Sequence, residues 1–193
     1  MMADVLLPAL LVAAGYLLGS ISTAIIACRL LGRPDPRSGG SRNPGATNVM
    51  RLAGRDAALI TLAGDMLKGV VPVIAARMIS DDPVIWMLTG FAAFAGHLFP
   101  LFFGFRGGKG VATALGVLLA LSPLVGALTI ATWLVTFAIA RISAVSALVS
   151  FLLAPVWVVL VLPSLAVTAL VGLMSALLFW RHRANVSALL QRR

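Results

Sequence analysis

Seven runs of apolar residues dominate the chain, separated by short polar segments. Six of them approach or exceed the length of about 20 residues that crosses the hydrocarbon core of a bilayer. The seventh, residues 111–121, is much shorter. The pattern predicts an all-α, polytopic integral membrane protein that forms a single transmembrane domain over residues 1–193. The runs are residues 5–28, 57–78, 84–103, 111–121, 124–140, 144–162 and 164–180.

The charges in the connections decide how many of these runs are separate helices. If Ser122 and Pro123 break the chain between the fourth and fifth runs, every basic connection lies on one side of the membrane and the acidic turn at 80–83 lies on the other. The positive-inside rule then predicts seven transmembrane helices, with the N-terminus outside and the C-terminus cytoplasmic. The fourth helix has only about 11 residues, short of the usual 17 to 25. It must be tucked inside the bundle, begin within the preceding loop, or be partly re-entrant.

Composition narrows the functional classes. Of 193 residues, 61% are hydrophobic and only 11% are charged, with a net charge of +9. In a membrane protein such an excess of cations indicates cytoplasmic loops, and no motif supports nucleic-acid binding. A single cysteine, Cys28, and two histidines without ligand spacing provide no basis for a metal site. We therefore expect an integral membrane protein that uses neither a metal nor another cofactor.

Two opposite charges interrupt the second apolar run. Asp65 and Lys68 are three residues apart, so they can pair on one face of a helix. Charged residues inside membrane segments are costly and often functional. The pattern leaves open whether these two form a structural ion pair or take part in function.

A glycine-rich stretch carries one of the two lysines. Gly107, Gly108 and Gly110 surround Lys109, and an apolar run begins near Val111. A P-loop is excluded, because the glycine spacing is too short and no Ser or Thr follows the lysine. Glycines and a helix start can nevertheless present N–H groups to an anion, and the lysine adds a mobile charge. The stretch indicates a phosphate site, with a basic turn among lipid headgroups as the alternative.

Further polar side chains lie in the other basic connections. Pro44 fits the first turn of a short helix, on which Asn48 and Arg51 would share a face. Cations surrounded by amides and hydroxyls bind phosphate or carboxylate groups. Attraction to anionic lipid would explain the arginines but not the neutral polar residues. The candidates are Ser41, Asn43, Thr47, Asn48, Arg51, Ser143, His182 and Asn185.

Four segments resemble the signatures of one family. Residues 40–51, Gly-Ser-Arg-Asn-Pro-Gly-Ala-Thr-Asn-Val-Met-Arg, are similar to the first signature of the PlsY family of bacterial membrane acyltransferases. Residues 96–113 are similar to the second, and residues 141–146 and 181–185 to the later ones. The resemblance covers essentially the whole chain. One departure is Arg42, where the family more often has glycine.

The resemblance implies the transfer of an acyl chain from acyl phosphate to glycerol 3-phosphate, which gives 1-acylglycerol 3-phosphate and inorganic phosphate for phospholipid synthesis. The enzyme would work as a monomer in the lipid bilayer of the bacterial cytoplasmic (inner) membrane, with its active site facing the cytoplasm. The family positions credited with phosphate binding correspond to Ser41, Arg51, Lys109, His182 and Asn185. To these we add Ser143 and the backbone amides of residues 107–110.

The residues suggest how the reaction would proceed. No protein nucleophile is evident, so we expect the substrate hydroxyl to attack the acyl carbonyl directly, aided by orientation and charge neutralisation. Lys109, Ser143 and His182 are the expected catalytic residues. A phosphate oxygen would take the proton, with His182 as the alternative base. The competing class is a membrane transporter of a phosphorylated metabolite, although such sites usually lie near the midplane between repeats.

Overall fold

A computed structural model describes residues 2–191, and every regular element in that part of the chain is helical. The chain divides into two compact units, one ending at Leu121 and the other beginning at Ser122, which are described separately. Unit 1 contains α1 (Met2–Gly19), α2 (Thr23–Leu30), α3 (Ala46–Ala53), α4 (Arg55–Ile79), α5 (Pro83–Leu98), the 3-10 turn η1 (Leu101–Phe103) and α6 (Val111–Leu121). Unit 2 contains α7 (Pro123–Ala140), α8 (Ser143–Val161), α9 (Leu165–Arg181) and α10 (Arg183–Leu190).

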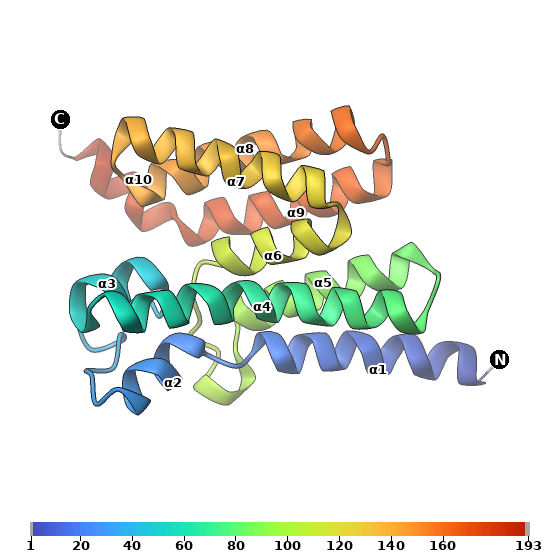
Figure 1. Ribbon diagram of the computed structural model, residues 1–193, viewed down its shortest axis with the longest axis horizontal. Helices are drawn as coiled ribbons and strands as arrows, with labels where there is room; N and C mark the ends of the chain where they lie inside the picture. Colours follow the sequence, from blue (N-terminus) through green and yellow to red (C-terminus); the bar gives the residue numbers. More distant parts are fainter. Residues whose placement is uncertain (1, 192–193) are drawn as a thin grey trace. The chain divides into compact units, whose positions relative to one another are not determined.

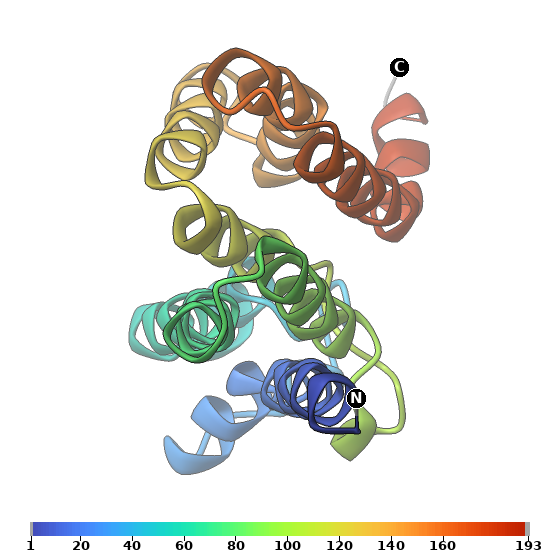
Figure 2. The same cartoon turned by 90° about the vertical axis from the view of Figure 1, so that its right-hand side faces the viewer.

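In unit 1, α5 packs against α1 and α4, and α6 packs against α4 and α5 (Figures 1 and 2). Glycines bring these helices close together. A Cβ on Gly19 of α1 would overlap the backbone of Ala93 in α5, and one on Gly69 of α4 would overlap the Thr113 carbonyl of α6. Small residues of this kind allow close helix packing in membranes, where hydrophobic burial provides no driving force.

The first apolar run is not one continuous helix. α1 ends at Gly19, α2 begins at Thr23, and the two are bent by 43°. The Ser20 hydroxyl donates to the Tyr16 carbonyl at 2.8 Å, so this side chain is the hydrogen-bond partner of a carbonyl in the last turn of α1. The sequence predicted a single span over residues 5–28. Polar side chains and glycine at the break explain the difference, because they compete with helical hydrogen bonds.

In unit 2, α8 packs against α7 and α9. The break predicted at Ser122 and Pro123 is confirmed: Ser122 is the N-cap of α7 and Pro123 occupies its first turn, where proline is favoured. The Trp157 indole N–H donates to the Thr132 hydroxyl at 3.1 Å and links α8 to α7. α10 bends away from α9 by 54° (Figure 1, red).

The helices confirm an all-helical, polytopic membrane protein. Among the described residues, four helices are long and apolar enough to cross a bilayer, and each bent pair could add one more span, for a total of up to six. α6 has 11 residues and is a separate helix from α7.

Candidate active site

The loop between α2 and α3 is held together by the side chain of Asn48. Its Oδ1 accepts the Ser41 N–H at 2.9 Å, while its Nδ2 donates to the Pro36 carbonyl at 2.8 Å and the Gly39 carbonyl at 3.3 Å. Asn48 is only 2% exposed. A buried amide with three hydrogen bonds to backbone has a strong structural role. Asn48, predicted to bind phosphate, is therefore placed where it shapes the loop.

The same loop contains backbone that suits glycine. Gly40 and Arg42 both have positive φ, at 58° and 55°. For a non-glycine residue that conformation is uncommon and costs of order 1 kcal/mol. This explains physically why the PlsY-like signature has glycine where this chain has arginine. The backbone of Arg42 thus occupies the left-handed region, and its side chain is exposed.

The other predicted residues of this segment are accessible. Ser41, Thr47 and Arg51 are exposed, and Asn43 is half-buried. α3 begins at Ala46 with Gly45 as its N-cap, two residues later than the start predicted at Pro44. Asn48 and Arg51 both lie in α3, as predicted, three residues apart. Asn48 is buried with its amide turned into the loop, whereas Arg51 is exposed.

The glycine-rich loop closes back onto the end of α5. The Gly108 N–H donates to the His97 carbonyl at 3.1 Å, which satisfies one of the last carbonyls of the helix. The Gly108 amide, which the sequence assigned to phosphate, is thus engaged within the loop. Gly110 is buried with φ of 86°. A side chain there would be strained and would also overlap the Phe94 ring.

Lys109 is more exposed than the glycines on either side of it. Gly107, Gly108 and Gly110 are buried, whereas Lys109 is half-buried. α6 begins at Val111, as predicted, so the positive end of its dipole lies immediately after the lysine. One turn into α6 the Thr113 hydroxyl is fully buried, and within the described chain it has no hydrogen-bond partner. The loop therefore concentrates positive potential at the start of α6.

Beneath the loop lies a buried polar cluster. The predicted pairing of Asp65 with Lys68 is confirmed, with 2.9 Å between Oδ1 and Nζ. The contact of these two residues with His97 was not predicted: its Nδ1 lies 3.6 Å from the same Asp65 oxygen. Asp65, Lys68 and His97 are 3%, 9% and 6% exposed. A histidine at the end of an apolar run, in a chain with charges inside another run, was the available signal.

In unit 2, the predicted residues occupy two helix boundaries. Ser143 is the first residue of α8 and is half-buried. His182 is the hinge between α9 and α10; it is buried, and its Nδ1 lies 2.9 Å from the Leu178 carbonyl. That carbonyl is an acceptor, so Nδ1 carries a proton. The Asn185 N–H donates to the His182 carbonyl at 2.8 Å, so one bend orients both residues.

Electrostatically, the predicted site residues are cationic or neutral. Outside the membrane segments, a hydrogen bond from the Arg37 side chain holds the pKa of the Asp35 carboxyl below its ordinary value. No group of three or more His, Cys, Asp or Glu that could hold a metal ion occurs among the described residues. The predicted residues therefore suit anionic substrates.

Comparison with known proteins agrees with this chemistry. A family profile described as glycerol-3-phosphate acyltransferase matches residues 9–192. The glycerol-3-phosphate acyltransferase of Thioalkalivibrio sulfidiphilus is 54% identical over 186 residues, covering 96% of this chain and 92% of that protein. The enzyme of Hydrogenovibrio crunogenus is 53% identical over 181 residues, covering 93% of this chain and 87% of that protein.

Solved structures give the same answer. Crystal structures of PlsY, an integral membrane glycerol 3-phosphate acyltransferase, in its glycerol 3-phosphate and lysophosphatidic acid forms superpose with TM-scores of 0.90 and 0.86 at 37% and 36% identity. Each match covers 96% of this chain and 93% of the other. Profile, relatives and structures together decide between acyltransferase and transporter in favour of the enzyme. The chain belongs to the PlsY family of integral membrane glycerol-3-phosphate acyltransferases, which produce lysophosphatidic acid.

Proposed function

We propose that this acyltransferase takes its acyl chain from acyl phosphate, not from a thioester. The observation that carries the proposal is the loop around Lys109, in which buried glycines present a half-buried lysine at the start of α6. Donor and acceptor would both bear phosphate, so their mutual repulsion must be neutralised before they can meet. A cation at a helix N-terminus supplies that neutralisation.

Each unit contributes residues for which we propose phosphate binding. In unit 1 these are Ser41, Asn43, Thr47, Arg51, Lys109 and the backbone amides of Gly107, Lys109 and Gly110. In unit 2 they are Ser143, His182 and Asn185. The hydrogen bonds of Asn48 assign it an indirect part, because it fixes the backbone at Ser41. The Gly108 amide has an indirect part, because it donates to the His97 carbonyl and so fixes the loop.

The reaction requires no covalent enzyme intermediate. A hydroxyl oxygen of glycerol 3-phosphate attacks the acyl carbonyl carbon, and the bond between that carbon and the phosphate oxygen breaks. The proton of the attacking hydroxyl passes to a phosphate oxygen, which gives 1-acylglycerol 3-phosphate and inorganic phosphate. Lys109 and Ser143 stabilise the developing negative charge. His182 is the alternative proton acceptor.

We further propose that the protein functions as one domain and as a monomer in the bacterial cytoplasmic membrane. Seven spans would place the N-terminus outside and the active site facing the cytoplasm, in keeping with the distribution of basic residues. The fourth span would be α6. Support for a tucked position comes from its close packing on α4, where Gly69 and Gly116 bring the two backbones together.

A donor assay tests the proposal. Purified protein would be given glycerol 3-phosphate with palmitoyl phosphate, palmitoyl-CoA or palmitoyl carrier protein, and lysophosphatidate and phosphate would be measured. We expect lysophosphatidate only in the reaction that contains palmitoyl phosphate as the donor. Equal turnover with either thioester would contradict the choice of donor.

Two variants of one loop test the role of Lys109. Losing a charge-assisted hydrogen bond costs about 1.5–3 kcal/mol, so Lys109→Ala should lower kcat/KM for glycerol 3-phosphate by about 10- to 100-fold. Arg106→Ala removes an exposed cation from the same loop and should change kcat/KM by less than about threefold. Equal effects of both variants would mean that only the loop's total charge matters.

A histidine variant tests the base. With a phosphate oxygen as proton acceptor, His182→Ala should weaken glycerol 3-phosphate binding and leave measurable turnover at saturation. If turnover disappears while binding is unchanged, His182 replaces phosphate as the base.

A further inference from the structure

The buried cluster of Asp65, Lys68 and His97 is the strongest unexplained feature of unit 1. Asp65 and Lys68 lie in α4, and His97 lies in the last turn of α5. One carboxylate oxygen of Asp65 faces both partners, at 2.9 Å from Lys68 Nζ and 3.6 Å from His97 Nδ1. Ionised groups are costly to bury this deeply. Packing of α4 against α5 does not require them, because apolar side chains would serve that purpose.

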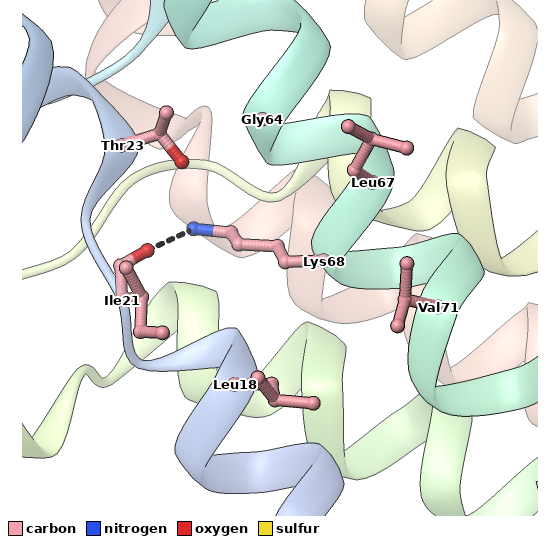
Figure 3. A pocket seen from close by; sticks show the side chains of 7 residues that line it. All are labelled: Leu18, Ile21, Thr23, Gly64, Leu67, Lys68 and Val71. Carbon is pink, nitrogen blue, oxygen red and sulfur yellow. Dashed lines mark hydrogen bonds between the residues drawn. The ribbon is translucent and has the colours of Figure 1, made fainter. Parts of the chain in front are cut away.

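The lysine end of the cluster reaches the break between α1 and α2. Lys68 Nζ donates to the Ile21 carbonyl at 2.9 Å, and Figure 3 shows the side chain extending from α4 to that link. The lysine also borders a cavity of about 250 Å³ whose other lining residues are mostly apolar. The ammonium therefore bridges α4 and the α1–α2 break.

The histidine end of the cluster supports the glycine-rich loop. The His97 carbonyl accepts the Gly108 N–H at 3.1 Å. The imidazole occupies the space beside Gly108, because a Cβ there would overlap Nε2 and lie 2.7 Å from Cε1. The ring is therefore in contact with the Gly108 backbone, and Lys109 is the next residue. The ring thus touches Asp65 through one edge and the loop through the other.

We infer that Asp65, Lys68 and His97 are positioning residues that fix the Lys109 loop for glycerol 3-phosphate. Lys68 anchors the Asp65 carboxylate, Asp65 orients the imidazole, and the imidazole sets where Gly108 and Lys109 lie. None of the three needs to touch substrate. The inference rests on the proposed phosphate-binding role of Lys109.

Neutral replacements test this without leaving a buried charge unpaired. Asp65→Asn combined with Lys68→Gln keeps two polar side chains of similar size, which is tolerated better than removing one partner. Because misplacement by about 1 Å can cost up to about 100-fold, we expect KM for glycerol 3-phosphate to rise about tenfold, with kcat within about threefold. His97→Ala should do the same, and His97→Gln should restore part of the loss.

A matched control separates positioning from general destabilisation. Thr61 lies one turn before Asp65 in α4, is fully buried, and donates to the Ala57 carbonyl at 2.7 Å. Thr61→Val removes that bond without touching the cluster. It should lower the melting temperature and leave KM for glycerol 3-phosphate within about twofold.

Combining variants tests whether the residues act in series. Adding His97→Ala to the neutral Asp65–Lys68 pair should raise KM little further, because both changes release the same loop. If the increases in KM multiply in the combined variant, the inference is wrong. It is also wrong if KM is unchanged in variants whose melting temperatures show that they are folded. If Lys109→Ala itself leaves KM unchanged, the proposed function of the loop fails first. If only Lys109→Ala raises KM, the function stands and the positioning role is wrong.

Discussion

The contact between α4 and α6 offers a direct test of how tightly the glycine-rich loop is held. Gly69 is buried in α4, and a Cβ on it would overlap the Thr113 carbonyl oxygen and lie 3.0 Å from the Val117 amide nitrogen. Ordinary van der Waals contact begins near 3.4 Å. For Gly69→Ala, the two helices must therefore separate by up to about 1 Å, the type of backbone shift by which overpacked cores respond.

The expected cost follows from two opposing effects. Alanine within a helix is favoured over glycine by about 0.5–1 kcal/mol, whereas overpacking costs about 1–3 kcal/mol. Gly172 in α9 provides a matched control, because nothing lies within 4 Å of a Cβ there. Gly172→Ala should therefore raise the free energy of unfolding and Gly69→Ala should lower it. Relative to one another the variants should differ by about 1–3 kcal/mol.

Thermal unfolding in detergent measures the difference. For a chain of this length 1 kcal/mol corresponds to about 2–4 °C, so the melting temperatures should differ by about 2–12 °C, with Gly69→Ala lower. Since α6 begins directly after Lys109 and Gly110, Gly69→Ala should also raise KM for glycerol 3-phosphate, whereas Gly172→Ala should not. Equal melting temperatures for the two variants would refute the close approach of α4 and α6.

Three further predictions concern the loop between α2 and α3. Gly40→Ala, where a side chain would be strained and would overlap the Asn48 amide oxygen, should lower the melting temperature more than Gly32→Ala, where φ is also positive but space is open. Arg42→Gly should raise stability by up to about 1 kcal/mol, because it relieves a left-handed backbone; a lower melting temperature would show that the arginine side chain contributes more than the strain. The lowered Asp35 pKa implies a stabilising contribution that is present above the ordinary aspartate pKa and is lost as the pH falls through the lowered value. Asp35→Asn should remove that part of the acid dependence of melting temperature, a small effect because the group is partly exposed.

The local features of the fold could be predicted from the sequence wherever one short pattern decided them. Ser122 and Pro123 broke a long apolar run because a cap and a proline stood together, and charge placement agreed. Glycines before Val111 marked the start of α6. Asp65 and Lys68 were close enough in sequence for their pairing to follow from helix geometry alone.

Features that depend on contacts between distant segments could not be predicted. Nothing in the sequence placed His97 beside Asp65, because that contact requires the packing of α5 on α4. The amide of Asn48 looked like a phosphate ligand until its three backbone partners were known. The bend after Gly19 was hidden because small residues in an apolar run are equally consistent with close packing of a straight helix.

The pairing of Asp65 with Lys68 has a consequence for how the protein enters the membrane. A lone charge near the bilayer centre costs about 2.5–3.5 kcal/mol on insertion scales. Because the two residues lie one helical turn apart in α4, they can neutralise each other as soon as that turn forms. Ile21, which accepts a hydrogen bond from Lys68, precedes α4 in the chain, whereas His97 follows it. During synthesis α4 can therefore be inserted with its charges already compensated, without waiting for α5 and its histidine to pack against it.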